Sequence, residues 1–213
     1  MTAVYNGHIP VVQLLLEHPG IDVNMTTENN DPNEGYGLTV LHLAGGKNNV
    51  EALRLLLAHP SLTCLNARDS NGNTPLMAAV SYGSIQCVKL LLEKPGIDVN
   101  MSTKDNSDGE PYGQTALHLA YVKDSLEILR LLLDHPTLAC LNAKDSEGHT
   151  PLMWAVSYGG IQCVKELVSL PEVDLTSKDD EGMGLEDIAR DAGQLEAWQV
   201  VREALKRREQ KQK

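Results

Sequence analysis

Apolar residues recur along the chain in short runs with helical spacing, and residues that start or stop helices bound each run. In the run 85–92, Val88, Leu91 and Leu92 fall on one helical face. Before it, Thr74 and Pro75 predict a helix start, because the Thr oxygen can cap free N–H groups and Pro is tolerated in the first turn. Gly83 predicts that this helix ends after about two turns. The pattern therefore predicts pairs of short helices joined by turns.

The helix-pair pattern recurs at an offset of 76 residues. Thr39-Val-Leu-His-Leu-Ala44 returns as Thr115-Ala-Leu-His-Leu-Ala120. Segments 24–99 and 100–175 are roughly 60% identical and align without a gap, which is far beyond chance. Each unit contains a long repeat followed by a short one, and the extra residues of the long repeats lie mostly in 25–38 and 101–114.

The short repeats read N-A-[RK]-D-S-x-G-x-T-P-L-M before a second apolar run, and this pattern resembles the ankyrin repeat. In the first unit the matching residues are Asp69, Gly72, Thr74, Pro75, Leu76, Ala79, Gly83 and Leu90 to Leu92. The long repeats keep His42 and His118 at the family's His position. The resemblance covers essentially the whole chain. It implies an all-α solenoid of helix–turn–helix units and hairpin loops, in which neighbouring repeats stabilise one another.

We expect one domain of about six repeats with a partial first repeat and a C-terminal cap. The expected divisions are 1–23 (partial), 24–65 (long), 66–99 (short), 100–141 (long), 142–177 (short) and 178–213 (cap and basic tail). The missing Thr-Pro-Leu start of the first repeat suggests a fragment of a longer protein. Met77 and Met153 replace the family's His, so its hydrogen bonds to the loop should be lost there. Gly45 and Gly46 each cost about 1 kcal/mol relative to Ala inside a helix, so that repeat should be softer.

Charge narrows the class of partner. The chain has a net charge of −11 and should repel nucleic acid and anionic membranes, so we expect neither as a partner. Residues 202–213 hold six basic and two acidic residues. The simplest interpretation of this basic tail is a solvated, frayed helix end, with docking or nuclear import as the alternative.

Little in the sequence indicates catalysis or a cofactor. The chain has neither a membrane-length apolar run nor a signal-peptide pattern, which favours a cytoplasmic or nuclear location. The four cysteines lack C-x-x-C spacing, so we expect free thiols and no metal site. With no Gly-rich phosphate loop after a strand, we expect no enzyme activity and no cofactor.

The resemblance also implies a binding surface, because ankyrin ligands usually contact the hairpin tips and the exposed face of the first helices. Exposed Tyr and Trp residues on such a surface are typical anchors, although the tyrosines could instead pack between neighbouring helices. Carried onto this chain, the expected contact residues are Lys47, Asn71, Asn73, Ser81, Tyr82, Lys123, Glu147, His149, Trp154, Ser157 and Tyr158.

The long hairpins are peculiar to this chain. The first carries Tyr36 with Glu28, Asp31 and Glu34, and the second carries Tyr112 with Asp105, Asp108 and Glu110. Since helix layers pack at about 10 Å, the two insertions should lie roughly 20 Å apart. We interpret them as acidic fingers that grip a basic segment of a protein or peptide, with mobile solvated loops as the alternative.

Asn24 and Asn100 end the sequences L-E-H-P-G-I-D-V-N and L-E-K-P-G-I-D-V-N. These match a pattern at which an asparaginyl hydroxylase modifies some ankyrin repeats. The competing interpretation is that each Asn only bonds the hairpin backbone, a common role of Asn in turns.

The sequence as a whole predicts a monomeric, non-catalytic scaffold or adaptor that binds a protein or peptide through its concave surface. The alternative is a regulatory or inhibitory module of a larger signalling protein or enzyme. A consensus-derived engineered binder is also conceivable, but the irregular long loops argue for a natural origin.

Overall fold

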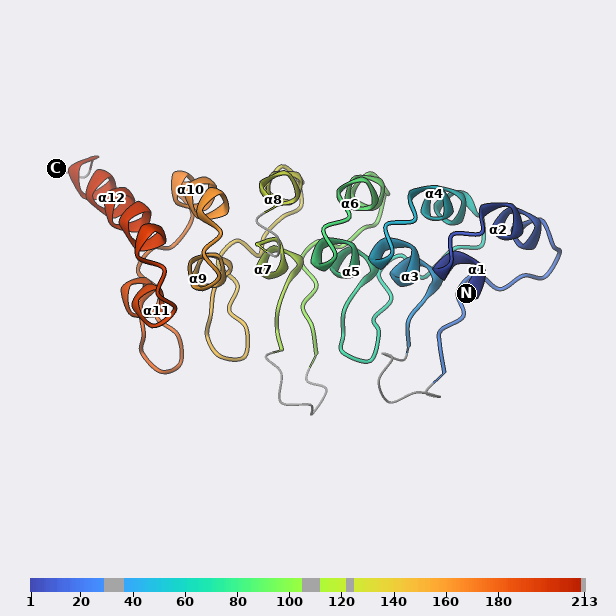
Figure 1. Cartoon of the computed structure of the whole chain (residues 1–213), viewed down its shortest axis with the longest axis horizontal. Helices are drawn as coiled ribbons and strands as arrows, with labels where there is room; N and C mark the ends of the chain where they lie inside the picture. Colours follow the sequence, from blue (N-terminus) through green and yellow to red (C-terminus); the bar gives the residue numbers. More distant parts are fainter. Residues whose placement is uncertain (29–36, 105–111, 122–124, 212–213) are drawn as a thin grey trace.

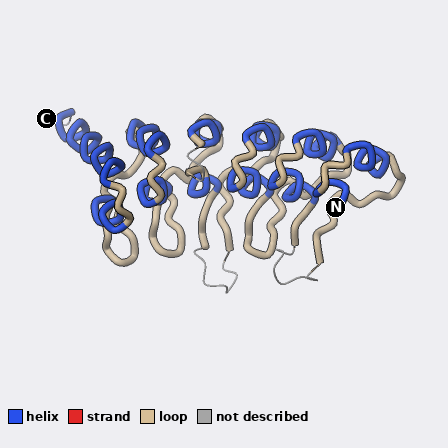
Figure 2. The backbone as a smooth tube through the Cα atoms, in the orientation of Figure 1, coloured by secondary structure: helices blue, strands red, loops and turns tan. Residues whose placement is uncertain are grey.

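The computed structural model describes residues 1–28, 37–104, 112–121 and 125–211, and these form twelve α-helices arranged in pairs. In chain order they are α1 (Thr2–Tyr5), α2 (Ile9–Leu16), α3 (Val40–Gly46), α4 (Val50–Ala58), α5 (Pro75–Ser81), α6 (Ile85–Leu92), α7 (Ala116–Leu119), α8 (Leu126–Leu133), α9 (Pro151–Ser157), α10 (Ile161–Ser169), α11 (Leu185–Asp191) and α12 (Leu195–Lys211). The described residues contain isolated β-bridges but no strand (Figure 2). The predicted all-α solenoid is confirmed.

The helices form two rows (Figure 1). The odd-numbered helices, here called the first-helix row, pack on one another in chain order, and the even-numbered helices form the second-helix row in the same way. The hairpin loops project beyond the first-helix row (Figure 1). Each layer therefore contacts mainly its two neighbours, as expected of a repeat array.

Local signals start and stop the helices as the sequence predicts. Thr74 Oγ1 accepts the Met77 N–H at 3.3 Å and caps α5, and Thr150 caps α9 through Met153 at the same distance. Gly83 follows α5 with a φ of +71°, a left-handed conformation that costs glycine little.

The core is a thin aliphatic layer between the two rows. Leu41, Leu76, Leu117 and Leu152 recur at equivalent positions of successive first helices and are almost fully buried. Burying one such side chain stabilises the fold by about 1.5–3 kcal/mol. Packing explains the glycine at position 45. A Cβ on Gly45 would lie 3.2 Å from Ala79 Cβ, so the lack of a side chain allows α3 to approach α5 closely.

The basic tail differs from the expected frayed end, because α12 continues to Lys211 and one of its side chains is anchored. The Arg208 guanidinium donates to the carbonyls of Leu170 and Val173 at 2.6 Å and of Val168 at 3.3 Å. Those carbonyls lie at and just beyond the end of α10, so Arg208 stabilises both helices at once.

His42 and His118 link each long repeat to the hairpin that follows it. His118 Nδ1 accepts the Thr115 N–H at 3.0 Å, and Nε2 then donates to the His149 carbonyl at 3.2 Å. His42 makes the same pair of bonds to Thr39 and Asn73. In the short repeats the Met77 sulfur accepts the Thr74 N–H at 3.4 Å, a local bond that leaves the link to the next hairpin unmade.

These two histidines predict how stability depends on pH. Burial is the largest influence on both, and it lowers the pKa of His42 and of His118 below the ordinary 6.5. The unfolded chain therefore takes up protons at higher pH than the folded chain. Their contribution to stability is complete above about pH 6.5 and decreases as the pH falls through that value.

The double variant His42→Met and His118→Met copies the natural short repeats. It should unfold more easily than the wild type at pH 7.5, because two links are lost, but its stability should change less between about pH 7 and pH 5.5. Urea denaturation across that range measures both effects. An unchanged pH dependence in the variant would show that other groups cause it.

Candidate functional site at the hairpin tips of the second unit

An aspartate builds each short hairpin. Asp145 Oδ1 accepts the backbone N–H groups of Glu147 and His149 at 3.0 and 2.9 Å. Asp69 makes the same two bonds in the preceding short hairpin, and Asp179 makes them in the hairpin of the C-terminal repeat. Because the aspartate fixes the turn, the second residue after it projects outward, and Asn71, Glu147 and Glu181 are all exposed at the tips.

The second oxygen of each aspartate has a different environment. Asp145 Oδ2 accepts the indole N–H of Trp154 at 2.7 Å, whereas Asp69 Oδ2 accepts the Asn73 amide at 3.2 Å. Asp179 Oδ2 accepts no hydrogen bond among the described residues, and it faces His149 Nε2 at 3.4 Å. The side chains of Asp145 and Asp179 are almost completely buried.

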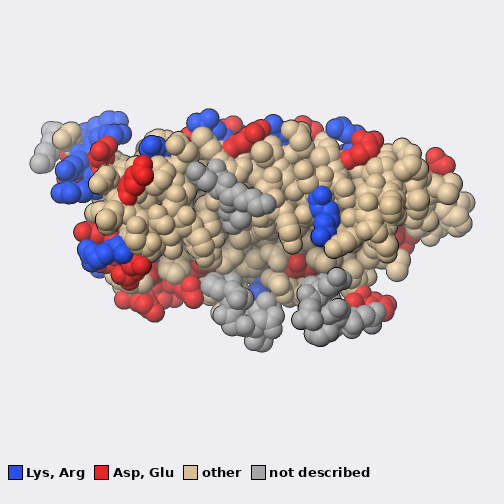
Figure 3. Space-filling model, in the orientation of Figure 1, with Lys and Arg blue, Asp and Glu red and all other residues tan. Residues whose placement is uncertain are grey.

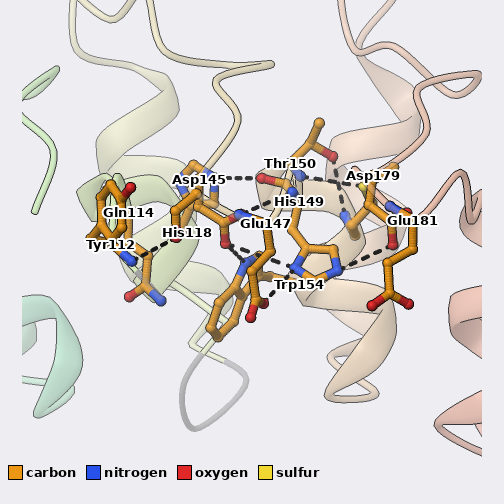
Figure 4. Close-up of polar contacts among 12 residues, drawn as sticks. Tyr112, Gln114, His118, Asp145, Glu147, His149, Thr150, Trp154, Asp179 and Glu181 are labelled. Atoms are coloured by element: carbon orange, nitrogen blue, oxygen red, sulfur yellow. Dashed lines mark hydrogen bonds and ion pairs between the residues drawn. The ribbon is translucent and has the colours of Figure 1, made fainter. Parts of the chain in front are cut away.

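His149 lies between two hairpins, with carboxylates on both sides (Figure 4). Its Nδ1 is 3.3 Å from Glu147 and 3.9 Å from Asp145, and its Nε2 faces Asp179 of the next hairpin. The ring also meets the edge of Trp154 at a centroid distance of 6.4 Å. His149 thus joins the acidic tips to the aromatic residues of the first-helix row.

Three aromatic rings stack beside these tips. Tyr158 lies 4.7 Å from Tyr121 and 5.6 Å from Trp154, measured between ring centroids. Tyr121 is buried, and burial raises its pKa, whereas Tyr158 remains 63% exposed and Trp154 is half-buried. We call Tyr121, Asp145, Glu147, His149, Trp154 and Tyr158 the aromatic–acidic site.

The aromatic–acidic site occurs in only one of the two similar units. At the equivalent positions the first unit carries Gly45 for Tyr121, Asn71 for Glu147, Asn73 for His149 and Ala78 for Trp154. Both units keep the residues that build the fold, including the hairpin aspartate and the capping Thr. These four differences bring additional aromatic and ionisable side chains together beside the tips of the second unit.

The other predicted contact residues have mixed environments. Tyr82 is 60% exposed, while Ser81 and Ser157 are half-buried. The Lys47 ammonium lies 4.2 Å from the centroid of the exposed Tyr5 ring, so these two residues already contact each other. Tyr112 is exposed, and its backbone N–H donates to Ser146 Oγ at 3.0 Å.

Several predicted residues lie outside the described part of the chain. They are Tyr36 and Lys123, with Asp31, Glu34, Asp105, Asp108 and Glu110 of the predicted acidic fingers. The grip of the long hairpins on a basic segment therefore stays a prediction.

Asn24 and Asn100 bridge successive repeats. The Asn24 amide donates to the Ser61 carbonyl at 2.7 Å and accepts the Thr63 N–H at 2.8 Å. Asn100 bonds Thr137 and Ala139 in the same way, and Asn66 and Asn142 make related bridges in the short repeats. Hydroxylation of Asn24 or Asn100 stays a prediction, and both amides are already engaged in holding neighbouring loops together.

Two members of the site, Tyr121 and Asp145, were not predicted from the sequence. A signal for Tyr121 was present, since a tyrosine replaces Gly45 between two units of high identity. The role of Asp145 could not be read from the sequence, because both units carry the aspartate and only the second places an indole against it.

Among the described residues, no cluster of His, Cys, Asp or Glu has the geometry to hold a metal ion, and all four cysteines are buried. No helix in the described ranges is both long and apolar enough to cross a bilayer.

The fold and this site together define a class: a helical repeat array that displays side chains from its hairpin tips and first helices. Residues 1–103 and 101–179 each match the family described as ankyrin repeats (3 copies). The chain belongs to the ankyrin repeat family, as its motifs indicated.

Curated relatives share this repeat region. SMC5-SMC6 complex localization factor protein 1 from Bos taurus is 35% identical over 141 residues, which are 66% of this chain and 12% of that protein. Inversin from Canis lupus familiaris is 33% identical over 145 residues, 67% of this chain and 13% of the relative. Alpha-latrotoxin-Lg1a from Latrodectus geometricus is 32% identical over 123 residues, 58% of this chain and 8% of the toxin. The chain thus spans only a small part of each relative.

Proposed function

We propose that this chain is a non-catalytic interaction module that binds a protein or peptide segment at the aromatic–acidic site. The observation that carries the proposal is the partly exposed Trp154–Tyr158 pair beside the acidic tips, which the first unit lacks because Ala78 stands at the position of Trp154. Tyr and Trp are the residues most often found as energetic anchors of interfaces.

The chemistry of the site favours a partner segment that carries Lys or Arg. Glu147, Asp180 and Glu181 are exposed at adjacent tips, and carboxylates gather below α9 and α11 (Figure 3). A cation held by these carboxylates would lie close to the exposed ring of Tyr158, and Lys47 already shows such a contact with Tyr5. Charges at the edge of an interface mainly accelerate association.

The relatives support binding as the role without identifying the partner. Their names describe a complex localization factor, inversin and a toxin, so one repeat fold serves proteins of different kinds. The proposal includes a cytoplasmic or nuclear location, where thiols such as those of the four buried cysteines stay reduced.

The alternative is a regulatory or inhibitory module within a larger protein. This alternative is favoured because, in each of the three relatives, the region similar to this chain makes up only 8–13% of a much longer protein. The two proposals share the same binding site and differ in the consequence of binding for the partner. An assay of the partner's activity with and without this chain separates them.

A selection from a random peptide library tests the proposal directly. Peptides that bind the wild-type chain should be enriched in Lys and Arg. Their association rate should fall about tenfold at low salt in the variant Glu147→Gln, Asp180→Asn, Glu181→Gln, because three steering charges are removed. The matched control Glu93→Gln, Asp134→Asn, Glu172→Gln removes three exposed acids elsewhere and should leave the rate almost unchanged. The absence of Lys- and Arg-rich peptides from the enriched set would refute the assignment of partner chemistry.

A further inference from the structure

A groove runs between α10 and α12, in the second-helix row and therefore away from the first-helix face of the aromatic–acidic site. Its volume is about 740 Å³, and apolar side chains including Val168, Val200 and Ala204 contribute to its lining. The remaining lining residues are Lys165, Ser169, Pro171, Glu203, Arg207, Arg208 and Lys211.

The groove exists because the last helix is longer than its counterparts. α12 has 17 residues, whereas α10 has nine, so α12 extends beyond the end of its neighbour. The bonds from Arg208 to the carbonyls of Val168, Leu170 and Val173 hold the extended part of α12 against the end of α10. Both walls are therefore fixed by the fold itself.

The charge of the groove is opposite to that of the chain. Its lining has four basic side chains and one acidic side chain, a net of +3, in a chain of net charge −11. Figure 3 shows Lys and Arg gathered at the α12 end of the molecule. Two of the four cations are already engaged, since Arg208 bonds carbonyls and Arg207 pairs with Glu203 at 3.0 Å.

The other two cations are available to a ligand. Lys165 and Lys211 are exposed, and neither forms an ion pair with any residue in the described ranges. In the first unit the charge of the equivalent lysine is paired. Lys89, which corresponds to Lys165, donates to Glu127 of α8 at 2.6 Å. At the last layer Glu203 pairs with Arg207 instead, which leaves Lys165 facing the groove.

We propose that this groove binds an acidic amphipathic segment of a partner protein. The partner's apolar side chains would lie against Val168, Val200 and Ala204, and its carboxylates would pair with Lys165 and Lys211. An apolar floor with charged edges is how helical peptides are commonly held in grooves. The site does not depend on the proposed function, because it uses different residues and the opposite charge.

The test uses the whole chain and a fluorescein-labelled helical peptide with leucines at i, i+4 and i+7 and glutamates at most other positions. A second peptide replaces every glutamate with lysine. Fluorescence anisotropy should show that the glutamate peptide binds with an affinity that falls as NaCl is added, whereas binding of the lysine peptide, which the aromatic–acidic site would hold, should not respond to substitutions in the groove. The variant Lys165→Glu with Lys211→Glu should bind at least about tenfold more weakly.

A control variant, Arg54→Glu with Arg190→Glu, reverses two exposed charges outside the groove and should bind like the wild type. Circular dichroism confirms that both variants are folded. The proposal is overturned if the glutamate peptide does not bind, if Lys165→Glu with Lys211→Glu weakens binding of the lysine peptide equally, or if both variants lose the same affinity. It is also overturned if sedimentation shows that a second copy of the chain occupies the groove, or if a DNA duplex binds there in place of the peptide.

Discussion

The substitution Gly148→Ala is expected to lower the free energy of unfolding by about 3 kcal/mol, because strain and a backbone clash act together. Gly148 has a φ of +81°, and a Cβ there would lie 2.7 Å from the Asp180 nitrogen and 3.0 Å from the Asp179 carbonyl carbon. These atoms are backbone and cannot rotate away. The following hairpin would have to move, which would break the bond from the Asp180 N–H to the Glu147 carbonyl at 3.0 Å.

Gly182→Ala is the matched control. Gly182 has nearly the same φ, +82°, but a Cβ there would have no atom within 4 Å. The substitution should lower the free energy of unfolding only by the strain of the left-handed conformation, about 1–2 kcal/mol. Urea denaturation of both variants measures the difference. Equal losses would mean that the hairpins are not stacked as closely as these distances require.

The second large effect is on binding. Trp154→Ala should weaken the affinity for a library-selected basic peptide by at least about 30-fold, the loss of a typical anchor residue of about 2 kcal/mol. It should also destabilise the chain, because the cavity left by the indole adds to the loss of the donor to the buried Asp145.

Two further variants separate these effects. Trp154→Phe keeps an aromatic ring but loses the indole N–H, so it should lose stability while retaining more of the affinity. Tyr82→Ala removes an exposed ring from the first unit and should leave the affinity almost unchanged. If Tyr82→Ala and Trp154→Ala weakened binding equally, the ligand would contact the whole array rather than the aromatic–acidic site.

Much of the fold could be predicted because its signals are local. Thr74 and Pro75 start α5, Gly83 follows it, and these residues act within a few positions of one another. The loss of the hairpin link at Met77 was predictable for the same reason, since it depends on which side chain stands at one position of the motif.

The remaining features depend on contacts between distant residues. The Asn24 amide bonds Ser61, and Trp154 bonds Asp145, only because the layers stack in one register. The sequence also could not show that Arg208 reaches the carbonyls beyond α10, so the tail was expected to fray. These contacts depend on the direction in which each side chain points toward the neighbouring layer, and a local sequence pattern does not contain that information.

The central claim is that partners bind at the tips and first helices of the second unit. Hydrogen–deuterium exchange of the chain with and without a selected basic peptide tests it most directly. Protection is expected in 145–149, 179–183 and along α9. Little change is expected in 69–73 of the first unit, or in α4 and α6 of the second-helix row. Protection confined to α4 and α6, or shared equally between the two units, would contradict the claim.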